Sequence, residues 1–600
     1  MYRIIKSRQP RLSQLISKKI VYKRLRLSPL IISFCTILLV FYDFGYNQND
    51  KTALFLNYCY TFTLLVGIIS TVARYLKKTE RPPLKALFFD LFSVLLFTVL
   101  IIEDLNLLPW FKFLNSKAWN YGALFLVFIR EFSALKLNLK KTYLNPAQIF
   151  IFSFLAIIVF GAFLLKLPNA TNEDIGFIDA LFTSTSAVCV TGLIVVDTGT
   201  YFTFFGQCII LVLIQLGGLG IMTFASYFSY FFRGGSSYES TVMIGDLTSS
   251  NKIGEVFSTL KNIILITFSI EALGAILIFS SLSSEVIYSF SDRSFFAIFH
   301  AISAFCNAGF STLNESLFAS DFRFNYSLQS IIMLLFIFGG LGFPIVFNLF
   351  SYIKYLIEKR FIPYLFNLRR DNIVQPWVVN LSSRITLITT ITLLVLGGIV
   401  FYFFEYDNSL AEHSPFGKII TALFGAATPR TAGFNTVDIS SLRLSTLMLV
   451  LLLMWVGASP ASTGGGIKTS TFAIATLNFW SLARGKNRIE IFRREIADIS
   501  VRRSFAIISL SLVVIGTATF LISYLDAEKD MLGIAFECFS AYSTVGLSVG
   551  ITPQLSAASK FIIIAVMFIG RVSMLSILIA LINKEKYKNY RYSKEEILIN

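Results

Sequence analysis

Long apolar runs separated by short polar or glycine- and proline-containing connections recur along the whole chain. A transmembrane helix needs about 20 mostly apolar residues to cross about 30 Å of hydrocarbon. Such runs lie at residues 30–42, 53–73, 86–102, 119–135, 148–165, 204–231, 260–280, 328–350, 385–404, 443–457, 504–524 and 559–582. The pattern predicts an all-α polytopic membrane protein with no soluble domain between the crossings.

Four segments between these runs are copies of one another: LFTSTSAVCVTGLIV, IFHAISAFCNAGFST, ALFGAATPRTAGFNT and AFECFSAYSTVGLSV. In each copy, a short amphipathic run ends in small residues. A glycine comes next, and it is followed by Leu or Phe. These glycines are Gly192, Gly309, Gly433 and Gly546, separated by 117, 124 and 113 residues. The repeating unit is predicted to be helix, half-helix, glycine strand and helix, which is a pore-loop hairpin.

The repeats divide the chain into five predicted parts. Residues 1–145 form an N-terminal extension with about four transmembrane helices. Pore repeats follow at 146–250, 251–370, 371–495 and 496–600, the last with a cytoplasmic tail. Four hairpins around one axis would form a single pore with pseudo-fourfold symmetry.

The chemistry of the glycine strands predicts an ion filter. Non-helical backbone at membrane depth must be packed in protein or line water. Glycine adopts positive φ without a steric penalty, so neighbouring carbonyl oxygens can replace the hydration shell of a cation. Each half-helix would add partial negative charge from its C-terminal end. Backbone oxygens suit hard alkali cations rather than transition metals, so we expect an alkali cation to bind there, without any metal cofactor.

The predicted filter consists of each glycine and the three residues before it. These residues are Cys189, Val190, Thr191 and Gly192; Cys306, Asn307, Ala308 and Gly309; Arg430, Thr431, Ala432 and Gly433; and Ser543, Thr544, Val545 and Gly546.

The distribution of charge predicts orientation. The net charge is +17, but Lys and Arg gather in alternate connections while the intervening ones are acidic or neutral. By the positive-inside rule both termini are cytoplasmic, which we favour over nucleic-acid binding. The glycine strands then enter from the outer side. Asp197 and Asp438, five residues beyond Gly192 and Gly433, either concentrate cations at the mouth or are ordinary surface acids.

The third repeat contains a segment that cannot remain helical, Met454 to Thr469, read as MWVGASPASTGGGIKT. Proline removes a helical hydrogen bond and glycine weakens a helix, at about 1 to 3 kcal/mol each. We therefore expect a loop inside the membrane, and a plain kink is the weaker alternative. With Arg571, the candidate functional residues here are Gly457, Ala458, Ser459, Pro460, Ser462, Thr463, Gly464, Gly465, Gly466 and Lys468, to which the family resemblance described below assigns the role of a gate.

Charged residues within apolar runs need partners or water, because an uncompensated charge there is costly. Arg571, placed mid-helix in the last crossing, is expected to face an aqueous pore. Arg430 and Glu537 occur in adjacent repeats and are predicted to pair behind the filter and support it. Glu271 is interpreted as a hydrogen-bonded packing residue, with an ion-coupling site as the alternative.

These motifs resemble the Trk/Ktr/HKT superfamily of potassium transporters over roughly residues 145–583. VCVTGL, CNAGFST, RTAGFNT and TVGLS are similar to its four filters, and the glycine-rich segment of the third repeat is similar to its intramembrane gate. The family has an arginine at the place of Arg571, which implies a barrier next to the loop. In plant members a serine at the first filter glycine is associated with sodium selectivity, so Gly192 implies potassium.

The resemblance also implies partners and location. A homodimer in the bacterial inner membrane, surrounded by lipid, is expected. Because the sequence has no nucleotide-binding βαβ unit, a separate cytosolic NAD- or ATP-binding subunit would regulate it.

Other functions stay open at this point. The same fold could conduct Na⁺, or couple K⁺ to H⁺ or Na⁺. A membrane-embedded lipid-modifying enzyme is a remoter alternative, since the sequence lacks clustered acidic or histidine motifs. Six cysteines without CxxC spacing support neither disulfides nor zinc. The N-terminal extension has the helix number of a voltage sensor, but its basic residues lack the regular spacing of a sensor helix.

Overall fold

The computed structural model describes residues 12–76, 84–104, 117–133, 146–220, 256–282, 289–357, 380–460 and 462–581. These residues are mostly helical; the strands among them are the short antiparallel pair β1 (Glu490–Ile491) and β2 (Arg494–Glu495). By length and composition, six described helices could cross a membrane, or seven if one bent pair counts as a single span. The chain is therefore an all-α polytopic membrane protein.

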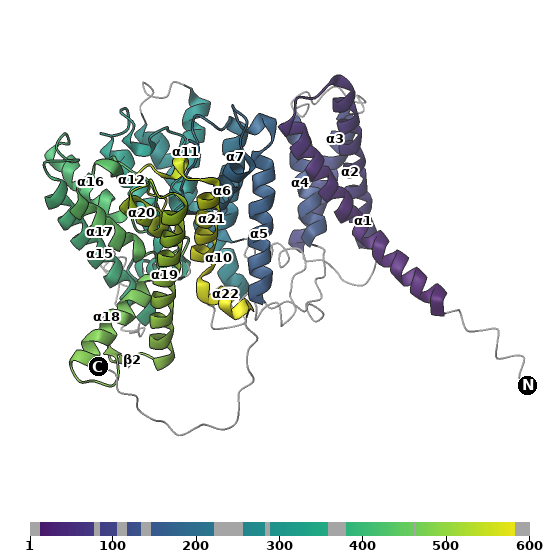
Figure 1. Ribbon diagram of the computed structural model, residues 1–600. Coiled ribbons are helices and arrows are strands. Elements are labelled where there is room, and N and C mark those ends of the chain that lie inside the picture. Colours follow the sequence, from purple (N-terminus) through teal and green to yellow (C-terminus); the bar gives the residue numbers. More distant parts are fainter. Residues whose placement is uncertain are drawn as a thin grey trace, which may run out of the picture.

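Four helices form an N-terminal bundle that stands beside the rest of the molecule (Figure 1). They are α1 (Leu12–Gly45), α2 (Asp50–Leu76), α3 (Leu84–Asp104) and α4 (Lys117–Ser133). The bundle has its own apolar core, in which Leu64, Phe97 and Leu124 are almost fully buried. Its outward-facing side chains, such as Phe55 and Phe88, remain exposed and apolar, as expected for a surface in contact with lipid.

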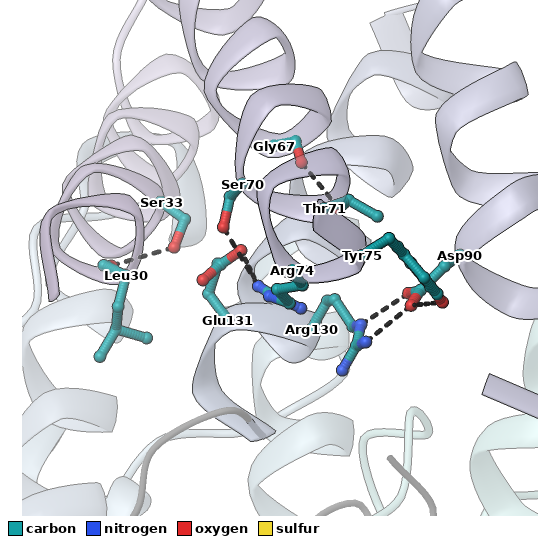
Figure 2. A network of polar contacts seen from close by, with 10 residues as sticks. All are labelled: Leu30, Ser33, Gly67, Ser70, Thr71, Arg74, Tyr75, Asp90, Arg130 and Glu131. Carbon is teal, nitrogen blue, oxygen red and sulfur yellow. Dashed lines mark hydrogen bonds and ion pairs between the residues drawn. The ribbon is translucent and has the colours of Figure 1, made fainter. Parts of the chain in front are cut away.

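Ion pairs are buried inside this bundle, near one end of it (Figure 2). The Arg130 guanidinium donates to both oxygens of Asp90, each at 2.6 Å, and Tyr75 donates to the same carboxylate at 2.7 Å. Arg74 pairs with Glu131. Because these contacts link α2, α3 and α4, they fix the register of the three helices as well as neutralising charge in an apolar interior.

Replacing Asp90 by Asn is expected to loosen the bundle. The change keeps the shape of the side chain but removes the carboxylate charge that accepts both hydrogen bonds from Arg130, and breaking a buried ion pair costs about 3 to 5 kcal/mol. Hydrogen–deuterium exchange should therefore rise across α3 and α4. Asp104, at the exposed end of α3, gives the matched control Asp104→Asn. Its hydrogen bonds from Thr61 and Asn120 lie in solvent, so hydrogen–deuterium exchange in this variant should stay close to wild type. Equal exchange in the two variants would contradict a structural role for the buried pair.

The bundle touches the remaining helices through the last turn of α1. The carbonyl oxygen of Phe44 accepts a 3.0 Å hydrogen bond from Asn169, and the Phe44 ring stacks on Phe205 with centroids 5.3 Å apart. Gly45 packs against Leu167 so closely that an added Cβ would lie 2.8 Å from its methyl carbons. The contact therefore lies on the first repeat, at Leu167, Asn169 and Phe205.

The rest of the chain repeats one arrangement four times. Each copy has a first helix, a half-helix and a second helix: α5 (Pro146–Leu165), α6 (Phe177–Val188) and α7 (Phe204–Leu219); α10 (Val256–Ser281), α11 (Phe290–Phe305) and α12 (Tyr326–Leu341); α15 (Leu381–Glu405), α16 (Pro415–Ala427) and α17 (Leu444–Trp455); α19 (Asp498–Leu525), α20 (Met531–Ser543) and α21 (Ala557–Val572). The half-helices have 12 to 16 residues, too few for any one of them to span about 30 Å alone.

The second helices end earlier than the apolar pattern predicts. The run 328–350 breaks at Gly342, where α12 meets α13 (Phe343–Leu356) at 109°, and the run 559–582 breaks at Ser573, before α22 (Met574–Leu581). Gly342 and Ser573 both have positive φ, as does Gly220 after α7, and a helix cannot continue through that conformation. The part of run 204–231 beyond Gly220 lies outside the described residues.

The third repeat differs at the same point. After α17 the chain forms an extended connection before α18 (Thr469–Ala483). We call residues 456–460 and 462–468 the intramembrane loop. Its ends lie side by side, since Val456 and Ile467 form a parallel bridge.

Candidate functional site

The backbone takes the same unusual path in all four copies. In each copy, two equivalent positions have positive φ: the repeat glycine and the residue two before it. The glycines have φ of 87° (Gly192), 71° (Gly309), 80° (Gly433) and 92° (Gly546), and the earlier residues have 57° (Val190), 62° (Asn307), 71° (Thr431) and 51° (Thr544). We call the latter four the base residues. Positive φ is unfavourable for β-branched side chains, so the surroundings must hold this conformation in place.

The glycines meet in a closed ring, which we call the glycine ring. A Cβ built on Gly192 would lie 2.4 Å from the carbonyl oxygen of Ala308, which precedes the second glycine. The corresponding distances are 2.9 Å from Gly309 to Ala432, 2.5 Å from Gly433 to Val545 and 2.3 Å from Gly546 to Thr191. Each copy therefore contacts the next and the fourth contacts the first. No residue with a side chain fits at these positions without moving the neighbouring backbone.

Hydroxyl groups on the last turn of each half-helix fasten the strand that follows. Ser186 and Ser540 accept hydrogen bonds from the amides of Gly192 and Gly546, at 3.0 and 3.1 Å. In the other two copies the hydroxyl donates to the carbonyl after the glycine: Ser303 to Phe310 at 2.7 Å and Thr428 to Phe434 at 2.5 Å. The sequence reasoning missed this role, although a hydroxyl five or six residues before every repeat glycine was the available signal.

Glycines in three second helices let those helices approach the half-helix ends. A Cβ on Gly217, Gly339 or Gly570 would lie about 2 Å from the carbonyl oxygen of Val188, Phe305 or Tyr542, respectively. The motifs LGGLG and FGGLG around the first two carry this signal in the sequence, and they too were missed.

The intramembrane loop crosses the glycine ring on the side of the base residues. The Thr463 hydroxyl donates to Asn307 Oδ1 at 3.0 Å, and the amide of Gly465 donates to the Thr544 hydroxyl at 2.9 Å. Between them, Gly464 lies against Thr431, whose Oγ1 would be 2.1 Å from an added Cβ. Since copies two and four lie opposite each other in the ring, a loop bonded to both spans the opening.

Other contacts hold the loop at its sides. The amide of Ser459 donates to the carbonyl oxygen of Gly340 at 2.9 Å, and Lys468 Nζ donates to that of Gly464 at 2.6 Å. Gly466 has φ of 68°, and Gly457 packs on the Gly465 carbonyl. The glycines and Pro460 thus end α17 and produce a compact connection, as the sequence predicts.

Arg571 contacts both the intramembrane loop and α7. The sequence places it mid-helix, and this is wrong: it is in the last turn of α21, two residues before the break at Ser573. Its guanidinium donates to the carbonyl oxygen of Thr463 in the loop and, at 2.6 Å, to that of Gly217 in α7. Arg571 therefore ties the loop to the first repeat, whose base residue Val190 offers no hydrogen-bonding side chain.

The predicted pair of Arg430 and Glu537 does not form. Arg430 donates to the carbonyl and hydroxyl oxygens of Thr390, both at 3.3 Å, and lies on the loop side of the ring, where it shares a small cavity with Ala458. Glu537 instead accepts from Ser548, Thr552 and the amide of Val549, which follow Gly546. The two side chains point to different sides of the ring, which corrects the pairing but leaves each in contact with structure next to a strand.

A double-mutant cycle of Arg430→Gln and Glu537→Gln is expected to show no coupling. Each change removes buried hydrogen bonds and should lower the free energy of unfolding by about 1 to 3 kcal/mol. Because the residues share no partner, the two losses should add within about 0.5 kcal/mol. Chemical unfolding in detergent measures the cycle, and an interaction energy above about 1 kcal/mol would restore the predicted pair.

Other predicted acidic residues have local partners. Asp197 accepts from the amides of Gly199 and Thr200, and Asp438 accepts from Ser440, so both cap the turns that follow a glycine strand. Glu271, buried in α10, accepts two 3.2 Å hydrogen bonds from Gln215 and one contact from the Cys306 thiol. Hydrogen-bonded packing therefore accounts for Glu271.

Comparison with known proteins places this geometry in a family. The family model TrkH, described as a cation transport protein, matches residues 125–592. The Ktr system potassium uptake protein B of Bacillus subtilis is 36% identical over 455 residues, covering 76% of this chain and 96% of that protein. The potassium/sodium uptake protein NtpJ of Enterococcus hirae is 32% identical, covering 76% and 97%.

A solved structure supports the same fold. The potassium transporter TrkH from Vibrio parahaemolyticus superposes with a TM-score of 0.58 at 17% sequence identity, covering 87% of this chain and 98% of that one. On the family match and the near-complete coverage of its relatives, the chain belongs to the TrkH family of cation transport proteins.

Proposed function

We propose that the chain is the membrane subunit of a potassium uptake system, with the glycine ring as its selectivity filter. The proposal rests on the closed ring of four glycines, in which each glycine packs against a backbone carbonyl oxygen of the next copy. In each strand, two residues with positive φ are separated by one residue, and this alternation changes the direction of successive carbonyl groups. Backbone oxygens at such a ring can replace the water around an alkali cation. Two relatives are named as potassium uptake proteins, which supports K⁺ as the ion.

The proposed pore is closed by the intramembrane loop and Arg571. The loop obstructs the axis sterically because it is bonded to opposite copies, and Arg571 adds positive charge at the same level. An ion leaving the filter would have to displace the loop. This proposal assigns the sixteen candidate filter residues and the loop residues the roles expected from the sequence, with Arg430 and Glu537 as separate supports.

Membership of a transport family excludes a membrane-embedded lipid-modifying enzyme. A second candidate within transport is uptake of Na⁺, or of K⁺ together with Na⁺, because one relative is named a potassium/sodium uptake protein. The retained Gly192 and the alternation of charge along the chain favour K⁺ uptake across a bacterial inner membrane with both termini cytoplasmic. The family resemblance supports a homodimer and a cytosolic nucleotide-binding regulatory subunit, and relatives named as Ktr system proteins B and D support a multi-component system.

Growth of a K⁺-uptake-deficient bacterium tests the function. Expression of the chain should restore growth at low K⁺, with and without candidate regulatory subunits. Flux in proteoliposomes, with K⁺, Na⁺ and protons replaced one at a time, then separates uncoupled K⁺ transport from coupling. Absence of K⁺ flux together with robust Na⁺ flux would replace the proposal by the second candidate.

A further inference from the structure

The contacts between the intramembrane loop and the glycine ring involve one class of residue. Asn307 and Thr544, which hydrogen-bond to the loop, and Thr431, which packs on it, are all base residues with positive φ. Three consecutive loop residues, Thr463 to Gly465, contact three successive copies of the ring. The loop is therefore fastened to the strands themselves and does not merely lie below them.

The base residues are held in a conformation that costs free energy. Left-handed backbone is strained at a residue other than glycine and persists only where the surroundings determine it. For Asn307, these surroundings include the Thr463 hydroxyl, and its Nδ2 also lies 3.4 Å from Thr431 Oγ1. For Thr544 they include the Gly465 amide. Loss of the loop would thus remove partners from the strained positions that shape the end of the ring.

Loop contacts are distributed unequally around the ring. Copies two and four bond to the loop through side chains, whereas the base residue of copy one is Val190, which has no polar group. On that side the connection runs through Arg571, from the Thr463 carbonyl to Gly217. Thr463 is the one described loop residue that both Asn307 and Arg571 engage, so its hydroxyl and its carbonyl hold the loop from two directions.

We propose that Asn307 and Thr544 are positioning residues that latch the loop through Thr463 and Gly465, so that release of the loop also changes ion discrimination at the base of the ring. This inference rests on the proposed function, because it assigns the closed state of that pore to named contacts. It further states that gating and selectivity share the same residues. A loop that only obstructed the axis would alter flux without altering discrimination.

Thr463→Val provides the test, since it keeps the branched shape and removes only the hydroxyl. One net hydrogen bond is worth about 1 kcal/mol, or about a fivefold change in the equilibrium between closed and open. Regulator-independent K⁺ flux into proteoliposomes should rise about fivefold, and the Rb⁺/K⁺ flux ratio should shift from wild type. Thr544→Val, which removes the acceptor of the second bond, should do the same. Thr476→Val in α18, where the hydroxyl bonds only within its own helix, is the matched control.

A second readout does not depend on transport. With Ser462→Cys introduced as a probe in purified protein, a charged thiol reagent should label the loop about fivefold faster in the Thr463→Val background, after subtraction of labelling in the parent without the probe. Faster labelling without K⁺ flux in any variant would support the latch and overturn the proposed ion. Folded Thr463→Val and Thr544→Val proteins with wild-type labelling, flux and Rb⁺/K⁺ ratio would overturn the latch.

Discussion

A serine at Gly192 is expected to reduce K⁺ transport at least tenfold and to lower the preference for K⁺ over Na⁺. The new Cβ would lie 2.4 Å from the Ala308 carbonyl oxygen and 3.2 Å from the Gly309 Cα, both of which are backbone atoms that no rotamer change can move. Gly192 also has φ of 87°, which a serine adopts only at a cost of about 1 to 2 kcal/mol. The carbonyl of the adjacent copy must therefore shift.

The experiment compares the K⁺/Na⁺ flux ratio in proteoliposomes for Gly192→Ser and Gly516→Ser. Gly516 lies in α19, and an added Cβ there meets no atom within 4 Å. The control therefore makes the same glycine-to-serine change without contacting the glycine ring. The control should keep the wild-type ratio. If Gly192→Ser folded, expressed and kept that ratio as well, the glycine ring would not be the filter.

Much of the fold follows from the periodic distribution of apolar residues. Each predicted run contains a helix, because about 20 apolar residues can satisfy their backbone in lipid only as a helix or within a barrel. The glycines of the four copies could be predicted because the four segments are similar in sequence and because glycine adopts positive φ without a steric penalty. The loop after α17 could also be predicted, because proline and three successive glycines cannot continue a helix.

Features that depend on tertiary contact could not be predicted. Ser573 breaks the last second helix although nothing in its residue type requires positive φ, and Arg571 consequently ends a helix where the sequence suggested a continuous one. Arg430 and Glu537 lie in adjacent repeats, which suggested a pair, but Arg430 follows the end of α16 whereas Glu537 lies within α20, and the two side chains bind different partners on opposite sides of the ring. Partner choice depends on rotation about each helix axis, which spacing along the chain constrains only within one helix.

Removing Arg571 is expected to give the largest increase in flux. Arg571→Gln deletes the charge and weakens the bridge from the Thr463 carbonyl to Gly217, so the steric and electrostatic barriers fall together. At an effective dielectric of about 20, a unit charge about 4 Å from a passing K⁺ contributes on the order of 4 kcal/mol. That would be roughly a thousandfold in rate before solvent screening is allowed for. Deletion of Ser462 to Gly465 should also raise flux, because it removes both hydrogen bonds from the loop to the base residues.

Arg571→Lys separates the two contributions. Lysine keeps the positive charge, but its single ammonium cannot reproduce the guanidinium fork that reaches two carbonyl oxygens. If the charge dominates, Arg571→Lys should retain most of the wild-type restriction while Arg571→Gln opens the path. If the bridge dominates, both should raise regulator-independent K⁺ flux in reconstituted vesicles. In either case the preference for K⁺ over Na⁺, set at the glycines of the ring, should persist, whereas the Rb⁺/K⁺ flux ratio should shift because the loop leaves the base residues. Wild-type flux in folded Arg571→Gln and loop-deleted proteins would mean that the loop serves packing and does not gate.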